Sequence, residues 1–383
     1  MAEHHPILVT HTGSLPRDPE LTDAVRREKA EGSHRSVAVM SQAVAAIREV
    51  VEEQLEAGID IVGDGEQGKV GFQIYVPQRM AGFGGQSERN APSDMALFPQ
   101  FSKMLQARLG DGEAAVDPPA AIGPVQYEGE QEAREDCQVL IDALDELGHP
   151  SSAAFVTAPS PGIVATTFRN RYYDSYEDYV RALAAELRTE YQIIIDSGLI
   201  LQIDAPDLAM ERTIYFGDDS LEKFLSAVDL HIDALNVALA DLPRDRVRLH
   251  CCWGNHESPH IHDVALQEIL PIISRAKVGA LGLAFANPRH QHEIDVLART
   301  GLPDEMKLIA GVIDTTTNYV EHPEVVSRRL QAAARAMGDP ALVLASPDCG
   351  FGTFAGYELV TSDVMWAKFA ALREGADLAI ETL

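Results

Sequence analysis

The stretch Val247-Arg-Leu-His-Cys-Cys-Trp-Gly-Asn255 joins a strand-like run to side chains that bind metals. Residues two apart in an extended strand point to the same side, so His250 and Cys252 can converge on one point. A further thiol, Cys349, follows in Ser346-Pro-Asp-Cys-Gly-Phe-Gly352. An imidazole and two thiolates are typical zinc ligands, and three protein ligands leave a fourth position for a reacting group. The pattern predicts a catalytic zinc site; the alternative is a strand-end histidine with two cysteines packed as small apolar residues.

Short apolar runs like the one before His250 recur along the chain, and segments with helical spacing separate most of them. Eight such runs begin near Ile7, Ile59, Phe155, Leu199, Val247, Gly279, Lys307 and Ala341. Helices are expected between them, for example over residues 37–55, 172–197, 221–242 and 324–337. Strands that alternate with helices form parallel sheets, and eight such units predict an α/β protein with a (β/α)8 TIM barrel. We expect a single barrel domain over residues 1–383.

One region, from residue 80 to about 133, breaks this alternation. It contains Gly82-Phe-Gly-Gly85, two isolated prolines and Pro118-Pro119, with few periodic segments. Glycine and proline interrupt helices and strands, and long connections of this kind often carry function. The region is therefore predicted to be an irregular insertion over the C-terminal rim of the barrel, and a candidate lid.

The composition limits the classes of partner. The 383 residues carry 31 Lys+Arg against 59 Asp+Glu, a formal net charge of −28. Such a surface disfavours binding to nucleic acid and to anionic membranes. No run of eighteen apolar residues occurs, Met1-Ala-Glu-His-His5 is no signal-peptide core, and the four cysteines suit a reducing compartment. We expect a cytoplasmic protein with no nucleic-acid or membrane partner, and a homo-oligomer remains open.

Four further polar groups follow predicted strands directly: Ser14, Glu66, Asp204 and Asp314. The carboxyl ends of barrel strands meet at one rim, which is where barrel enzymes place their active sites. Ser14 lies in a Gly-Ser-Leu-Pro-Arg turn, and Glu66 ends an Asp-Gly-Glu segment. Paired carboxylates could bind an amine or act as a base, whereas a solvated loop is the alternative. Asp314 is our candidate catalytic residue.

Five segments in consistent order resemble the cobalamin-independent methionine synthase family; they surround Ser14, Glu66, Asp204, His250 and Cys349. The resemblance covers most of the chain. It implies a zinc ion held by His250, Cys252 and Cys349, with the amino-acid part of homocysteine held by Ser14, Glu66 and Asp204. It also implies attack by a zinc-bound thiolate on an alkyl carbon. A metal-bound thiolate exists at neutral pH, although a free thiol has a pKa of about 8.5.

Three positions depart from the family pattern. Ala284 stands where the family has a glutamate as fourth zinc ligand, and Met210 stands where it has another glutamate. Thr316 replaces a histidine that protonates the departing folate. The chain is also half the length of the two-barrel methionine synthases. These departures argue against methylfolate as donor more than against zinc–thiolate chemistry.

Other details resemble a single-barrel branch of the family, which is itself similar to epoxyalkane:coenzyme M transferases; they lie in residues 252–255, 287–290, 317–322 and 349–354. The expected function is zinc-dependent alkyl (methyl) transfer from an alkyl donor to a small homocysteine-like or coenzyme M-like thiol. Within enzymes, an epoxide-opening thiol transferase remains an alternative, as does a lyase or hydrolase that uses zinc as a Lewis acid. A metal-sequestering scaffold and a metal-free enzyme like uroporphyrinogen decarboxylase also remain, the latter sharing the barrel by analogy only.

Overall fold

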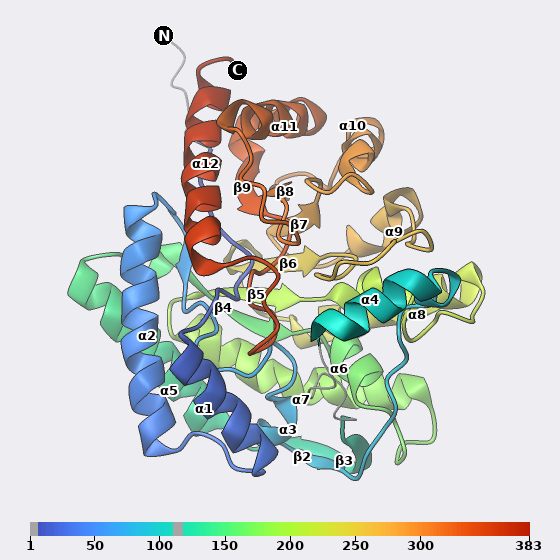
Figure 1. Ribbon diagram of the computed structural model, residues 1–383. Helices are drawn as coiled ribbons and strands as arrows, with labels where there is room; N and C mark the ends of the chain where they lie inside the picture. The colour runs from blue at the N-terminus through green and yellow to red at the C-terminus, as the bar shows by residue number, and fades with distance from the viewer. Residues whose placement is uncertain (1–6, 110–117) are drawn as a thin grey trace.

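A parallel sheet of seven strands forms the centre of the molecule in this computed structural model, which describes residues 7–109 and 118–383. Along the sheet the strands are β1 (Val62–Gly63), β4 (Ala154–Pro159), β5 (Ile200–Asp204), β6 (Val247–Cys251), β7 (Ala280–Ala284), β8 (Lys307–Ile313) and β9 (Val343–Pro347). The strands lie side by side in chain order, and helices surround them (Figure 1). Strands buried on both faces need continuous apolar runs, which is why β5 to β9 were recognisable in the sequence.

The structure corrects the prediction of a first strand near Ile7. Residues 7–10 form no named strand, but Val9 makes an isolated parallel bridge to Ala345 of β9, and Thr10 makes one to Ile61, just before β1. The Thr10 N–H donates to the Ala345 carbonyl at 2.9 Å. The segment thus touches both edges of the sheet. The structure therefore has seven strands and this bridging segment in place of the eight strands expected. Residues 7–10 are no strand because they pair with each edge of the sheet through only one bridge.

Helices lie around the sheet, and several of them pack against its strands. In chain order the longer ones are α1 (Pro19–Ala30), α2 (Val37–Glu56), α4 (Pro99–Leu109), α5 (Glu130–Leu147), α7 (Tyr176–Asp196), α8 (Leu221–Ala238), α9 (Leu266–Ile273), α11 (Pro323–Met337) and α12 (Ser362–Ile380). Shorter ones are α3 (Val76–Arg79), α6 (Pro161–Thr167) and α10 (Ile294–Thr300). Helix α7 buries Leu183, Leu187 and Ile194, which recur on one face at helical spacing.

The start of α7 corrects the predicted helix over 172–197. The Ser175 side chain accepts a hydrogen bond from the Asp178 N–H at 3.0 Å, as an N-cap does, so the helix begins at Tyr176. Tyr172 and Tyr173 lie before it and stack edge to face. The spacing of the tyrosines does not show where the helix begins, because the helix is capped by Ser175, two residues after Tyr173.

The region 80–133 is more regular than predicted. Strand β2 (Met80–Gly84) pairs antiparallel with β3 (Ala120–Tyr127), and α4 lies between them in the sequence. Helix α5 begins at Glu130, within the range assigned to the insertion. Residues 110–117 of the predicted insertion lie outside the described residues. Two of the three glycines that suggested irregular structure, Gly82 and Gly84, lie in β2, and Gly85 follows it. Gly82 has a φ of 95° beside a register shift.

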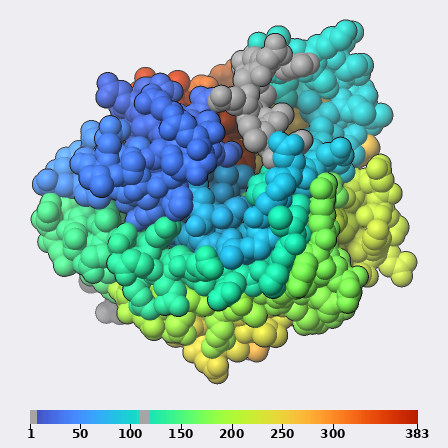
Figure 2. Space-filling view, turned by 90° about the horizontal axis from the view of Figure 1, so that it is seen from below, coloured from blue at the N-terminus to red at the C-terminus, as the bar shows by residue number. Residues whose placement is uncertain are grey.

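Figure 2 shows the face of the molecule on which the N-terminal helices and the segment that contains α4 both lie. In Figure 2 the N-terminal helices, in blue, and the segment that contains α4, in cyan, lie on either side of a hollow. No helix among the described residues is both long enough and apolar enough to cross a membrane.

Candidate active site

Three soft ligands meet at the carboxyl ends of β6 and β9. His250 lies on β6, Cys252 follows that strand directly, and Cys349 follows β9. Their potential ligand atoms all lie within 4.8 Å of one another. Nε2 of His250 is buried and has no hydrogen-bond partner in the described part of the chain. The structure therefore brings together the trio that the sequence predicted.

The two thiols have a separation that suits a shared metal. Their sulfur atoms lie 3.9 Å apart. Two thiolates bound to a tetrahedral zinc at ~2.3 Å are separated by about 3.8 Å. An imidazole and two thiolates also form a donor set that zinc prefers. The residues present fit a zinc ion.

The thiols differ in acidity because they share one hydrogen bond. That bond to Cys349 is the largest influence on the pKa of Cys252 and, with the nearby His250, lowers it well below its ordinary value. The same bond, followed by burial, raises the pKa of Cys349. Cys251, as expected from strand alternation, is fully buried elsewhere, and burial raises the pKa of its thiol. The shared hydrogen bond therefore couples the ionisation of the two thiols.

Two predicted substrate-binding carboxylates, Glu66 and Asp204, are buried at the same edge of the sheet. Asp204 ends β5 and pairs in register with His250 of β6. Burial raises the pKa of Asp204 to about 6 and that of Glu66 to about 7. The charge of Asp204 is one of the causes that raise the pKa of Glu66. The nearby Lys69 lowers the pKa of both carboxylates, and a further cation beside them would act in the same direction.

Glu66 is held in an unusual backbone conformation. Its φ is 56°, its N–H donates to Asp64 Oδ1 at 2.9 Å, and its Oε1 accepts from the Thr157 hydroxyl at 3.0 Å. Its second carboxylate oxygen, Oε2, is buried with no hydrogen-bond partner among the described residues. Left-handed backbone at a non-glycine residue costs free energy and clusters at functional sites. Glu66 therefore offers a free acceptor to a ligand.

Ser14 lies beside the loop that carries Cys349. Its carbonyl accepts from the Phe351 N–H at 2.8 Å. The buried Arg17 fastens the same turn, donating to the Gly352 carbonyl at 2.9 Å and to the Glu66 carbonyl at 2.7 Å. Sequence reasoning missed this role of Arg17, although the residue ends the quoted Gly-Ser-Leu-Pro-Arg turn. Arg17 holds the segments of Ser14, Glu66 and Cys349 together.

Asp314 follows β8, at the predicted edge of the sheet, but its side chain is engaged by its own loop. Oδ1 accepts from the Thr316 N–H at 2.9 Å and from the Thr316 hydroxyl at 2.8 Å, and Oδ2 accepts from the Thr317 hydroxyl at 2.9 Å. These bonds shape the turn after β8. Thr316, at the position of the family histidine, is thus bound to Asp314.

The other two residues that depart from the family pattern, Ala284 and Met210, are also packed into their surroundings. Ala284 ends β7 and is buried. Met210 lies so close to the loop after β6 that a Cβ on Gly254 would come 3.0 Å from its sulfur. Glu211, one step later in the sequence, is fully buried and paired with Arg89. The carboxylate next to Met210 therefore holds the 80–109 segment.

Two residues that sequence reasoning missed anchor the ligand loops. Asn255 donates to the Gly350 carbonyl at 2.6 Å and accepts from the Thr315 hydroxyl at 2.8 Å. Asp348 is buried, and its carboxylate accepts hydrogen bonds from the backbone N–H groups of Phe285 and Ala286, both at 2.9 Å. Burial raises the pKa of Asp348 to about 7. Both residues stand within the quoted metal motifs, which was the available signal.

Comparisons with known proteins identify the family of the chain. A family model described as "Cobalamin-independent synthase, Catalytic domain" matches residues 116–371. The chain is 25% identical over 390 residues to the uncharacterized protein YxjH of Bacillus subtilis, covering 98% of this chain and 94% of that protein. It is 23% identical over 385 residues to a methionine synthase of Saccharolobus solfataricus, covering 99% and 96%.

A solved structure shares the fold. A B12-independent methionine synthase from a Shewanella species, in complex with selenomethionine, superposes with a TM-score of 0.74 at 20% identity and covers 98% of both chains. The family match spans more than half of the chain and includes Asp204, His250, Cys252 and Cys349. The protein therefore belongs to the cobalamin-independent synthase family, as a member of its catalytic-domain type.

Proposed function

We propose that the protein is a zinc-dependent methyltransferase that alkylates a homocysteine-like amino thiol. The observation that carries the proposal is the convergence of His250, Cys252 and Cys349 beside the buried carboxylates Glu66 and Asp204. Zinc, when bound, would supply a site where a substrate thiol is held as its thiolate at neutral pH. The methionine synthases among the relatives support the choice of thiol.

The protein's own residues would orient the amino-acid part of the substrate. Glu66 presents the free acceptor oxygen Oε2, and the charge of Asp204 is close enough to raise the pKa of Glu66. Together they suit an ammonium group, because a bound cation offsets the cost of ionising two buried carboxylates. Ser14 stands at the side of the Cys349 loop, where its hydroxyl or backbone could meet the substrate carboxylate. An amino thiol fits these groups better than coenzyme M, which has no amine.

The methyl donor is the less specified substrate. The family histidine that protonates folate is Thr316 here, and the Thr316 hydroxyl is already bound to Asp314. We infer a donor whose leaving group needs no proton from this position. Asp314 stays our candidate catalytic residue through its control of this turn.

For the architecture we propose the complete (β/α)8 barrel as one domain. The two bridges of Val9 and Thr10 to opposite edges of the sheet support closure by this segment. Of the predicted insertion, the described residues 89–109 would then lie over the rim as a lid, since Arg89 pairs with Glu211, which follows β5.

Two measurements test the proposed function. First, Cys252→Ser and Cys349→Ser should each lower zinc from about one per chain to well below that, because each removes a thiolate ligand. Cys137→Ser, which changes a buried thiol in α5, is the matched control and should keep its zinc. Zinc content after dialysis decides the question. Unchanged zinc in both ligand variants would refute the assignment.

Second, homocysteine binding should release about one proton near pH 7, because a thiol with a pKa of ~8.5 is mostly protonated there. Homoserine, which has a hydroxyl in place of the thiol, should bind without that release. Calorimetry in buffers of different ionisation enthalpy counts the proton. Equal proton counts for the two ligands would contradict a thiolate mechanism.

A further inference from the structure

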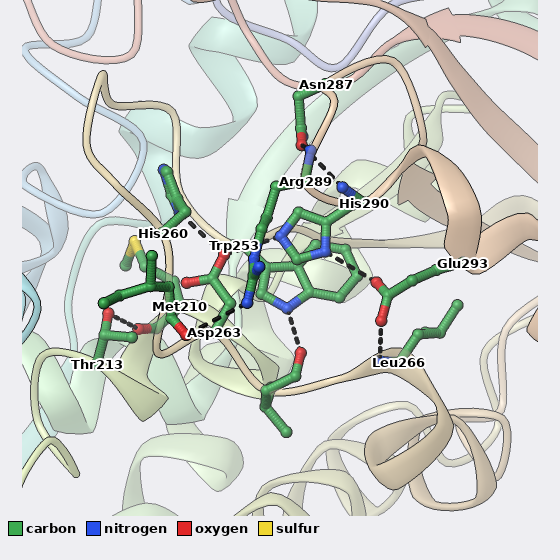
Figure 3. Close-up of polar contacts among 12 residues, drawn as sticks. Met210, Thr213, Trp253, His260, Asp263, Leu266, Asn287, Arg289, His290 and Glu293 are labelled. Carbon is green, nitrogen blue, oxygen red and sulfur yellow. Dashed lines mark hydrogen bonds and ion pairs between the residues drawn. The ribbon is translucent and has the colours of Figure 1, made fainter.

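The indole of Trp253 is fixed on a histidine from the next strand's loop. Trp253 follows Cys252 directly and is buried, and its ring N–H donates to the Val264 carbonyl at 2.7 Å. Its face stacks on the His290 ring with centroids 3.9 Å apart and an interplanar angle of 18° (Figure 3). A rigid, buried side chain next to Cys252 leaves the thiol little freedom of its own. The position of His290 therefore bears on the position of Cys252.

His290 is itself held from both sides by carboxylates. Its Nδ1 lies 2.8 Å from Glu293 Oε2, and its Nε2 lies 2.8 Å from Asp263 Oδ2. Figure 3 shows the two carboxylates at opposite edges of the ring. A neutral imidazole has one N–H, so both contacts are satisfied only by the imidazolium form. An imidazolium also stacks favourably on an indole face.

Each of the two carboxylates also has a second donor. Asp263 also contacts His260 Nδ1 at 2.9 Å, and Glu293 accepts from the Leu266 N–H at 2.6 Å. Burial alone would lower the pKa of His290, but its hydrogen bonds to Asp263 and Glu293 outweigh burial and raise that pKa. The stack on Trp253 is therefore a charged, fully bonded contact.

The backbone beside His290 continues to the second thiol. The Asn287 side-chain oxygen accepts from the His290 N–H at 3.0 Å, and its Nδ2 faces Asp348 Oδ2 at 3.4 Å. Asp348 also accepts from the Asn287 N–H at 3.1 Å, in addition to the two backbone donors already described. Because Asp348 immediately precedes Cys349, the loop 285–290 contacts the neighbours of both cysteines.

We propose that the loop of residues 285–290 is a clamp that sets the separation of the Cys252 and Cys349 thiols, with His290 and Asp348 as its positioning residues. The proposal rests on the proposed function, since it concerns how the same ligands are held. Strand β7 ends in Ala284 and offers no ligand of its own. Its loop instead contacts Trp253 and Asp348, the neighbours of the two cysteines. Direct hydrogen-bond partners of metal ligands change metal affinity by about 10- to 100-fold, and we expect the lower end of that range for contacts one residue away.

Variants on each side of the clamp test this inference. His290→Gln keeps a polar side chain but cannot bond both carboxylates as a cation, and Asn287→Ala removes the bridge while leaving the buried histidine intact. His292→Gln, an exposed histidine two residues further on, is the matched control. Zinc affinity is measured by competition with a chelator, and the thiolate-to-metal absorption of the cobalt(II) form reports the ligand geometry.

We expect both clamp variants to bind zinc about 10-fold more weakly and to shift the cobalt spectrum, whereas His292→Gln matches the wild type. The double variant should lose less affinity than the product of the two single losses, because both act through one loop. Wild-type affinity and spectra in both single variants, with far-UV circular dichroism showing that they are folded, would overturn the clamp. A wild-type protein that binds no zinc would instead overturn the proposed function.

Discussion

Two glycines allow the side chains of the site to approach one another. A Cβ on Gly350 would stand 2.0 Å from the Ser14 Oγ, and one on Gly13 would stand 2.7 Å from Glu66 Oε1. Gly13 also has a φ of 134°, which L side chains rarely adopt. Ser14 can therefore approach the Cys349 loop, and Glu66 can approach the turn before Ser14, only because Gly350 and Gly13 lack side chains.

The buried Ala284 leads to a prediction at the family's glutamate position. Ala284→Glu should raise zinc affinity, because a carboxylate there would add a fourth ligand to His250, Cys252 and Cys349. It should also slow thiol binding by filling the position that the substrate takes. Ala284→Gln has the same size without the charge and serves as the control. Equal zinc affinity in both variants would show that this strand end does not face the metal.

Glu66 gives a pH dependence with a definite sign. Burial raises its pKa in the folded protein to about 7 from an ordinary value of 4.5. The folded state therefore holds the proton more tightly, and this stabilisation is complete below pH ~4.5 and lost as pH rises through ~7. Glu66→Gln should gain stability relative to the wild type between pH 5 and pH 8, by up to about 3 kcal/mol.

Urea unfolding of the ligand-free protein at several pH values measures this difference. Glu177→Gln, an exposed carboxylate on α7, is the control and should show no such trend. A stability difference between Glu66→Gln and the wild type that stays constant from pH 5 to pH 8 would contradict the raised pKa.

At the level of elements, one buried carboxylate fastens the β2–β3 sheet to helix α7. Glu190 of α7 accepts from Tyr75 Oη at 2.7 Å, from Arg79 Nη1 at 3.0 Å and from Tyr127 Oη at 3.0 Å. These donors come from the residue before α3, from α3 itself and from β3. The segment that was expected to be irregular is thus ordered by contacts with α7.

Removing this acceptor should be costly. Glu190→Met should destabilise the protein by about 1–3 kcal/mol, because two buried tyrosine hydroxyls lose their acceptor. Arg79 keeps its ion pairs with Glu132 and Asp136. Glu177→Met removes an exposed carboxylate of the same helix and should cost about 0.5 kcal/mol or less. Thermal and urea unfolding give both values. Similar losses in the two variants would refute the fastening role.

For the whole molecule, the bridging segment connects the two edges of the sheet. Thr10 bonds the Ala345 carbonyl through its N–H, the Ile61 carbonyl through its hydroxyl at 2.9 Å, and accepts from Arg248 Nη1 at 2.9 Å. Arg248 lies inside the sheet, with its guanidinium 3.6 Å from the centroid of the Phe155 ring. The segment therefore also provides a hydrogen-bond acceptor for the buried guanidinium of Arg248.

Thr10→Pro should destabilise the protein by about 3 kcal/mol or more, because proline has no N–H for Ala345 and restricts the backbone before it. Thr10→Ser retains the N–H and the hydroxyl and should remain close to the wild type. Unfolding curves of the two variants compare these effects. A stable Thr10→Pro variant would mean that the segment contributes little to holding the sheet edges.

Local pattern determined much of this protein. The buried strands were visible as apolar runs, and Lys307–Ile313 has the predicted bounds. His250 and Cys252 could be paired from their spacing because a strand fixes the direction of alternate side chains. Cys349 could be added because the carboxyl ends of parallel strands share one edge of the sheet. Family resemblance added the candidate roles of Ser14, Glu66 and Asp204.

Tertiary structure decided the features that depend on residues far apart in the chain. The pairing of Met80 with Tyr127 and the single bridges of Val9 and Thr10 leave no mark in a local apolar pattern. The contacts of Asp348 and His290 likewise join loops that only the fold brings together. The sequence therefore determined which side chains reach the rim, because alternation is local. The tertiary structure decided which contacts hold these side chains in place, because hydrogen bonds between loops depend on how the strands are placed side by side.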